Sequence, residues 1–308
     1  MKQIIFNVGG ALSTYTEFDD KKLMVDIGGS AEFNPVIDFL LPLFKKRGND
    51  KSSKDANKYA IDQLIISHPH DDHISAIAEF QEHFYPELLT CPNDNIGMPE
   101  NQKINWELFD KNPNIDILRE MLIGRVPPLR TTSDQNEFIY FLAPKDVEGD
   151  TELSSESYCN NISICTFLII NTFRMFMPGD VQKLGMIELI SKNNFLRNKL
   201  KGGVDVLIAP HHGLRSSFST EMFDLIRNGK TRSLNIISEK VAGDDARNVD
   251  TRYSSSDYCE GDNNLKNGDT KTNQIKTSRG HIYIDYQKKD YINIEVFQDI
   301  KDVFKRFI

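Results

Sequence analysis

Long apolar runs are absent from this chain of 308 residues. No stretch approaches the ~20 apolar residues that a membrane-spanning helix requires. The first residues, 1–9, predict a strand and a turn, and they lack the pattern of a cleavable signal peptide. We therefore expect no membrane segment and a cytoplasmic location.

Cysteine and positive charge are also scarce. The four cysteines form no CxxC pair, which favours thiols that pack in the reduced state. The 45 acidic residues outnumber the 37 lysines and arginines, so the net charge is −8. A chain this acidic is not a general nucleic-acid coat, because binding phosphates requires local cations. An enzyme whose cleft alone is positive remains possible, since bound metals would add charge at the site itself.

The remaining composition suits a folded α/β protein. A hydrophobic content of 39% is enough for a sizeable core. The predicted strands are 3–8, 22–27, 61–67, 138–143, 162–170, 173–177, 204–209, 234–238, 281–286 and 292–297. The predicted helices begin at 34–35 and 74, and cover 181–192, 220–226 and 299–307. Strands and helices alternate in two halves, which predicts two sheets flanked by helices. Residues 92–135 are expected to be irregular, and residues 241–276 to form a long surface loop or a partly disordered segment.

The most informative stretch is residues 67–73, SHPHDDH, which follows the apolar run 64–66. It holds three of the chain's seven histidines and two aspartates. Imidazole nitrogens and carboxylate oxygens are the usual protein ligands of Zn²⁺, Mn²⁺ and Fe. The stretch therefore predicts a metal-binding loop, with a solvated polar loop as the alternative.

More residues of ligand type follow other apolar runs. Asp26 lies within VDIG, Asp180 ends the sequence MPGD, and the pair His211 and His212 follows residues 204–209. Each piece alone is a weak signal. Because each follows a strand-like run, we expect them to converge with the metal-binding loop at one edge of a sandwich.

Taken together, these pieces resemble the metallo-β-lactamase fold superfamily over about residues 1–286. The resemblance implies an αββα sandwich, with residues 1–308 as a single domain. It also implies two divalent cations, Zn²⁺ or Mn²⁺, held at a dinuclear site.

The resemblance assigns His68 and His70 to a first metal, and Asp72 and His73 to a second. Asp180 would bridge the two metals, which lie roughly 3.5–4 Å apart in dinuclear hydrolytic sites. The resemblance also implies catalytic roles for two of these residues. Asp72 would accept a proton, and Asp180 would act as the carboxylate that bridges the metals.

The remaining ligand positions each have more than one candidate residue. Either His211 or His212 completes the second site; we favour His212, with His211 supporting a ligand or contacting substrate. Asp26 is expected to brace the site from behind its ligands. The family's third histidine of the first site is missing, and Asn160 or Asn161 occupies the equivalent region. An amide oxygen is a weaker ligand that favours harder ions, so the first site is expected to bind loosely and to prefer Mn²⁺ over Zn²⁺.

A bound phosphate group would need hydrogen-bond donors and positive charge near the metals. The candidates for this substrate-binding role are Ser163, Arg215, Ser216, Ser217 and Lys276. Taken alone, each of them fits an ordinary surface side chain better than a phosphate ligand.

Further elements resemble the ComEC-like branch, named after the β-lactamase-like domain of a DNA-uptake protein. They are FNVG at 6–9, LAP at 142–144, NNIS at 160–163, PHHG at 210–213 and TSRG at 277–280. The chain departs from the branch at His70, where aspartate is frequent. It also lacks the membrane channel of full-length ComEC, so a role as a transport pore does not carry over.

The resemblance implies a metal-dependent hydrolase, specifically a phosphodiesterase or nuclease that acts on DNA or another phosphodiester. A small-molecule hydrolase for esters, lactones, thioesters or cyclic nucleotides is the alternative, and a catalytically silent binding module is a third. A positive groove beside the site would favour the nuclease, and a narrow apolar pocket the small-molecule enzyme.

Overall fold

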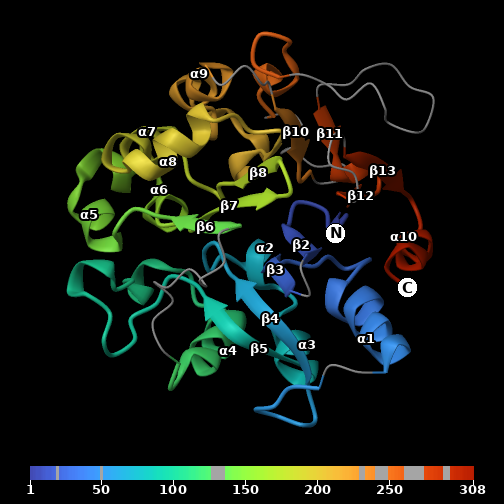
Figure 1. The fold of residues 1–308 in the computed structure, drawn as a ribbon. Coiled ribbons are helices and arrows are strands. Elements are labelled where there is room, and N and C mark those ends of the chain that lie inside the picture. Colours follow the sequence, from blue (N-terminus) through green and yellow to red (C-terminus); the bar gives the residue numbers. More distant parts are fainter. Residues whose placement is uncertain are drawn as a thin grey trace.

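The computed structural model describes residues 1–18, 21–48, 51–125, 136–228, 233–239, 249–259, 274–286 and 292–308. Two β-sheets pack face to face, and helices cover their outer faces (Figure 1). The expected αββα architecture is therefore confirmed, whereas the single domain over 1–308 stays a prediction. Most of the expected loop at 241–276 lies outside the described residues.

The first sheet carries the metal-binding loop. Its strands, in spatial order, are β13 (Asn293–Phe297), β12 (His281–Asp285), β1 (Lys2–Ile5), β2 (Ser13–Phe18), β3 (Lys21–Ile27), β4 (Tyr59–Ile65) and β5 (Phe84–Thr90). Strands β3, β4 and β5 run parallel, and the other neighbouring pairs are antiparallel. Parallel pairing brings the end of β3 beside the end of β4, where the metal-binding loop begins.

The second sheet carries Asp180 and the adjacent histidines. Its strands, in spatial order, are β11 (Gln274–Lys276), β10 (Leu234–Ile237), β9 (Val206–Ile208), β8 (Phe173–Met177), β7 (Cys165–Ile170) and β6 (Glu137–Tyr140). Strands β8 to β11 are parallel, so the loops that follow β8 and β9 emerge at the same edge.

Most of the helices lie on the outside of the sandwich. They are α1 (Leu41–Arg47), α2 (Asp71–Ile74), α3 (Ile77–His83), α4 (Pro113–Leu122), α5 (Pro144–Gly149), α6 (Thr151–Asn161), α7 (Lys183–Lys192), α8 (Asn194–Lys201), α9 (Thr220–Asn228) and α10 (Ile300–Phe307). A π-helical turn, Val36–Leu40, precedes α1. Among the described residues, no helix is long and apolar enough to cross a membrane.

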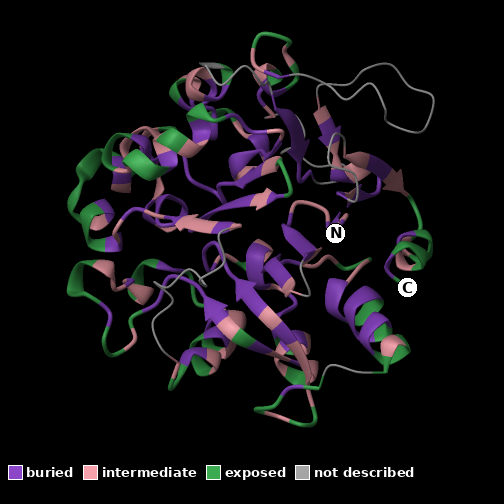
Figure 2. Ribbon diagram, viewed as in Figure 1, coloured by how far each residue is buried: buried purple, intermediate pink, exposed green. Residues whose placement is uncertain are grey.

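Strand periodicity explains how the core divides into layers. Alternate residues of a strand point to opposite faces of its sheet. Ile282 and Ile284 of β12 therefore enter the core between the sheets, while Tyr283 packs outward on Phe307 of α10, with ring centroids 5.8 Å apart. Figure 2 shows the result: buried strands lie between helices whose outer faces are exposed.

Three strands were missing from the sequence prediction. Strand β11 falls within residues 241–276, where a loop was expected. Strand β2 was taken as part of a turn, because its buried Ser13, Thr14 and Thr16 look like surface residues in the sequence. Strand β5 contains Pro86, which argues against a central strand but is tolerated at a sheet edge, where β5 lies.

The prediction of an irregular segment at 92–135 was also wrong in part. Helix α4 forms there, and it buries Ile115, Leu118 and Leu122 along one face. Asn112 caps its first turn by accepting a hydrogen bond from the backbone N–H of Asn114 at 2.9 Å.

A buried histidine makes the stability of this fold sensitive to pH. His281 packs on Phe33, with ring centroids 4.6 Å apart, and its Nδ1 accepts a hydrogen bond from the backbone N–H of Asn7. Burial lowers the pKa of His281 to about 4 from the usual 6.5. The unfolded chain therefore binds a proton at this position before the folded chain does as the pH falls.

We predict that this residue removes stability as the pH falls from 6.5 towards 4, by at most about 3 kcal/mol. The measurement is urea unfolding across this pH range, with the His281→Asn variant as reference because it keeps a hydrogen-bond acceptor. A stability difference between the two proteins that does not change with pH would contradict the prediction.

Candidate metal centre

The metal-binding loop leaves β4 and is held by the buried carboxylate of Asp26 at the end of β3. That carboxylate accepts hydrogen bonds from the backbone N–H of Ser67 at 2.7 Å and from its hydroxyl at 2.9 Å. Its Oδ2 also lies 2.7 Å from Nδ1 of His73. Because Nδ1 of His73 is occupied by Asp26, Nε2 is left to face the site.

Asp180 follows β8 on a tight turn. Gly179 has a φ of +61°, and a Cβ at this position would lie 2.9 Å from the Cβ atoms of Ser67 and Ser163. The backbone N–H of Asp180 donates to the hydroxyl of Ser163 at 3.2 Å. These contacts place Oδ1 of Asp180 3.3 Å from Nε2 of His73.

Asp180 does not cap the helix that follows it. Helix α7 begins at Lys183, and the residue at its N-cap is Gln182, whose backbone N–H donates to Oδ1 of Asn161. The Asp180 carboxylate faces the imidazoles instead, although it is almost fully buried.

The histidine pair after β9 lies on a strained turn. Both His211 and His212 have positive φ, 47° and 56°. The backbone N–H of His211 donates to the carbonyl of Gly179 at 3.1 Å, which fixes the turn against the Asp180 loop. Nε2 of His212 lies 3.0 Å from Oδ2 of Asp72, and Nε2 of His211 lies 3.9 Å from Oδ2 of Asp180.

Four of these residues form one candidate site for a cation. The ligand atoms of Asp72, His73, Asp180 and His212 all lie within 4.8 Å of one another. Nε2 of His73 is buried and has no hydrogen-bond partner among the residues that the structure describes. An orphaned ligand atom between two carboxylates fits a metal ion, because the cation would satisfy the nitrogen and offset the negative charge.

His68 and His70 form a second set of nitrogen ligands beside the first. Nε2 of His68 lies 2.9 Å from Nδ1 of His70 and 4.0 Å from Oδ2 of Asp180. The same Asp180 carboxylate therefore borders both sets. This is the arrangement that a bridging carboxylate requires.

The electrostatics favour positive charge between these groups. Burial lowers the pKa of His68 and of His70, which keeps both rings in the neutral form that binds metals. Burial alone would raise the pKa of Asp180, but the charge of His73 outweighs it and holds the pKa well below its usual range. The pKa of Asp72 is lowered for the same reason. Both carboxylates thus stay ionised.

The two asparagines expected near the first site differ in role. The side chain of Asn161 is occupied: Oδ1 accepts from Gln182, and the amide donates to the carbonyl of Leu153 at 3.0 Å. Asn161 therefore supports the Asp180 loop from behind. Oδ1 of Asn160 is buried and has no hydrogen-bond partner in the described part of the chain, so it stays available as an oxygen ligand.

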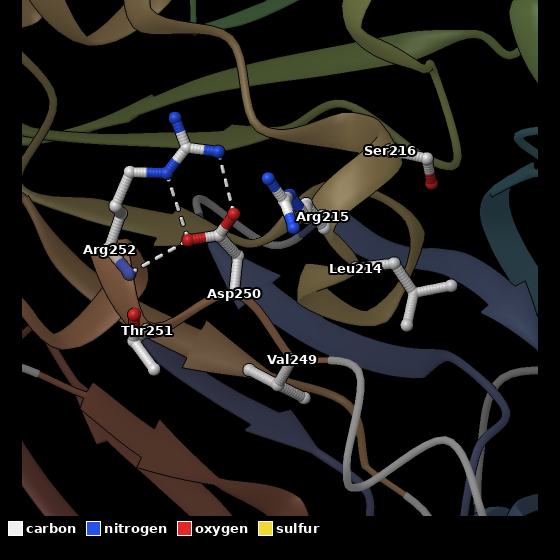
Figure 3. Close-up of a pocket in the computed structure, with 7 residues that line it drawn as sticks. All are labelled: Leu214, Arg215, Ser216, Val249, Asp250, Thr251 and Arg252. Carbon is white, nitrogen blue, oxygen red and sulfur yellow. Dashed lines mark hydrogen bonds and ion pairs between the residues drawn. The ribbon is translucent and has the colours of Figure 1, made fainter.

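The predicted substrate-binding residues do not all lie at one surface. Ser163 and Ser217 are fully buried, and the hydroxyl of Ser217 donates to the carbonyl of Pro210 at 2.7 Å. Lys276 forms an ion pair with Glu239. Arg215 and Ser216 are exposed and line a cavity next to the histidine turn (Figure 3).

Sequence reasoning missed several residues that position the site. Ser67 contacts Asp26 and lies 3.2 Å from Nδ1 of both His68 and His73, and its place directly before the first histidine was the available signal. Asn112 and Asn114 each donate to Oδ1 of Asp71 at 2.8 Å, which ties α4 to the metal-binding loop. Their separation of about forty residues from Asp71 gave no local signal.

Comparison with known proteins finds one matching family model. The family model of the metallo-beta-lactamase superfamily matches residues 7–155, which include Asp26 and the metal-binding loop. No curated protein matches the chain.

Several solved structures are similar at low identity. A metallo-beta-lactamase of Thermotoga maritima is 15% identical over 64% of this chain and 84% of its own, with a TM-score of 0.35. YhfI from Bacillus subtilis is 13% identical over 68% and 70%, with a TM-score of 0.33. The short form of human tRNase Z is 12% identical over 77% and 91%, with a TM-score of 0.31.

Of these comparisons, the family model is the one that concerns the site residues. That model covers the segment that supplies the metal-binding loop and its brace, Asp26. Residues 7–155, just under half of the chain, match the model of the metallo-beta-lactamase superfamily, and the two packed sheets with outer helices are the fold of that superfamily.

Proposed function

We propose that this protein is a metal-dependent hydrolase that cleaves phosphodiesters, with DNA as its substrate. The observation that carries the proposal is the cluster of Asp72, His73, Asp180 and His212, bordered by His68 and His70. The finer assignment to DNA is supported by the elements that resemble the ComEC-like branch.

The second metal would be held by Asp72, His73 and His212, together with Asp180. His212 is preferred to His211 here because its Nε2 lies 3.0 Å from Oδ2 of Asp72.

The first metal would be held by His68, His70 and Asp180, with His211 as a third nitrogen donor. Nε2 of His211 lies 3.9 Å from Oδ2 of Asp180, and Nε2 of His68 lies 4.0 Å from the same oxygen. The chain's other two histidines are committed elsewhere: His83 lies beside Glu82, and His281 is bonded to Asn7. Oxygen Oδ1 of Asn160 is the alternative donor.

When bound, divalent cations would activate water and stabilise negative charge on the phosphoryl oxygens. The chain's own carboxylates divide the remaining work. The Asp72 side chain is 38% exposed and the Asp180 side chain only 4%, so Asp72 is the one that reaches the solvent side of the site. His212 orients the Asp72 carboxylate, which can then accept a proton from the attacking water.

A small-molecule hydrolase is the second candidate, and the net charge of −8 favours it over a nuclease. The deciding experiment compares single-stranded DNA, double-stranded DNA and small esters or lactones. Mn²⁺, Mg²⁺ and Zn²⁺ are supplied separately. Cleavage of esters without cleavage of DNA would replace the proposal with this candidate.

Removing the first ligand pair should abolish hydrolysis. We predict that the combined substitution His68→Ala and His70→Ala removes activity while circular dichroism stays like that of the wild type, because the residues lie on a loop. Chelation followed by re-addition of metal should reproduce the loss reversibly. Full activity of the double variant would mean that the reaction occurs at another site.

Asp26, whose carboxylate contacts Nδ1 of His73, should affect the affinity of the site for metal. We predict that Asp26→Ala weakens metal binding by roughly 10–100-fold, because His73 loses the partner that orients it. Competition with a fluorescent chelator would measure this, and Asp26→Asn, which keeps an acceptor oxygen, should lose less. Equal losses in the two variants would point to general damage of the loop.

Asp180 allows the sharpest single test. Asp180→Asn keeps the shape but removes the charge that two cations share. We predict the loss of one metal equivalent by mass spectrometry and a fall in turnover of at least ~100-fold, about 2.7 kcal/mol. Wild-type metal content and turnover in this variant would refute the bridging role.

A further inference from the structure

A cavity of about 720 Å³ lies next to the histidine turn. It is lined by Leu214, Arg215, Ser216, Val249, Asp250, Thr251 and Arg252 (Figure 3). Two segments that are far apart in the sequence form its walls, and neither segment supplies any of the metal-ligand candidates. The cavity is therefore separate from the metal centre, although the chain connects the two directly.

Hydrogen bonds fix the cavity walls to the turn that carries the histidines. The backbone N–H of Leu214 donates to the carbonyl of His211 at 3.0 Å, and that of Asp250 donates to the carbonyl of Gly213 at 2.9 Å. Arg215 follows His212 by three residues, so their Cα atoms are at most ~11 Å apart. The Arg215 side chain is thus within reach of a substrate group that neighbours the metals.

One of the two arginines in the cavity is structural. Arg252 forms a two-pronged ion pair with Asp250, at 2.6 and 2.9 Å, and its guanidinium lies 3.9 Å from the ring centroid of Phe218. Asp250 also caps the turn Thr251–Ser254 through the backbone N–H of Arg252. These contacts fix Arg252 in place and neutralise the Asp250 carboxylate.

The other arginine leaves the cavity with excess positive charge. Arg215 is exposed, and within the described residues it makes no side-chain hydrogen bond or ion pair. Figure 3 shows the Asp250 carboxylate between the two guanidinium groups, so two positive charges face one negative charge. On a chain with a net charge of −8, this is a local site for an anion.

The cavity also offers groups that suit a nucleotide. Ser216 and Thr251 provide hydroxyl donors, and Leu214 and Val249 provide an apolar wall. A guanidinium binds a phosphate through paired N–H groups, and the apolar wall can contact a sugar or base.

We propose that this cavity binds the phosphate and nucleoside next to the bond that is cleaved, with Arg215 as the phosphate ligand. The inference rests on the proposed phosphodiesterase function and narrows its substrate class. The preferred substrate is a chain of phosphodiesters rather than a diester that has one phosphate. Arg215 is a specificity-determining residue in this scheme and does not act on the reacting atoms.

The test compares Arg215→Gln with Arg306→Gln, which removes the same charge from α10, a helix that supplies none of the cavity or site residues. Binding of a fluorescent single-stranded phosphorothioate oligonucleotide is followed by anisotropy at several salt concentrations. Arg215→Gln should weaken binding roughly 10-fold, and the slope of log K against log salt should fall by about 0.7, as expected for one lost phosphate contact. Arg306→Gln should change neither value.

The second arm measures hydrolysis of bis(p-nitrophenyl) phosphate, which has one phosphate and no flanking nucleotide. Arg215→Gln should raise the KM for DNA several-fold more than the KM for this substrate, because only DNA has a flanking phosphate and nucleoside that reach the cavity. Equal losses on both substrates would place Arg215 at the cleaved phosphate and overturn the proposal, as would unchanged DNA binding. If the wild type hydrolyses neither substrate with any metal, the phosphodiesterase function fails, and the binding arm alone still decides the role of the cavity.

Discussion

The carboxylate of Asp26 is the contact on which the geometry of the metal centre depends. It is fully buried at the end of β3, where it receives two hydrogen bonds from Ser67 and one contact from His73. Burying a charge is costly unless hydrogen bonds and partner charges compensate. Here the compensation comes entirely from the metal-binding loop, so the loop's position and the orientation of His73 follow from that need.

The backbone at three residues of the candidate site is strained. Asp26, His211 and His212 all have positive φ, a conformation that non-glycine residues rarely adopt. Each such residue costs about 1–3 kcal/mol and persists only where the surroundings impose it. Parallel pairing of β3 with β4, and of β8 with β9, supplies that constraint because it fixes the points from which the loops start. The turn at His211 and His212 then directs the two imidazoles towards the carboxylates of Asp180 and Asp72.

Charge is distributed unevenly over the molecule. The chain as a whole is acidic, yet the cavity beside the histidine turn has one unpaired guanidinium among the described residues. Metal ions at the adjacent cluster would add further positive charge. Attraction of the proposed phosphodiester substrate would therefore depend on this small region, because the net negative charge of the chain opposes non-specific binding of nucleic acid.

The sequence by itself singled out the candidate ligand residues and determined the α/β class, because both are local signals. Histidines and aspartates in residues 67–73 come directly after a strand, and hydrophobic periodicity reports strands such as β8 and helices such as α7. Hydrophobic periodicity did not predict β2, because its polar residues are buried by neighbouring strands. It did not predict β5 either, because Pro86 argues against a strand except at a sheet edge.

Only the tertiary structure decided which residues meet. Asp72 and His212 are 140 positions apart, and the cavity joins residues 214–216 to 249–252, so no local pattern contains either contact. The same holds for the asparagines. The side chain of Asn161 is hydrogen-bonded to Gln182 and Leu153, while Oδ1 of Asn160 has no partner among the described residues. This difference between adjacent identical residues depends on packing alone. Side-chain roles of this kind arise from distances across the fold, and a linear chain does not encode those distances in any short stretch.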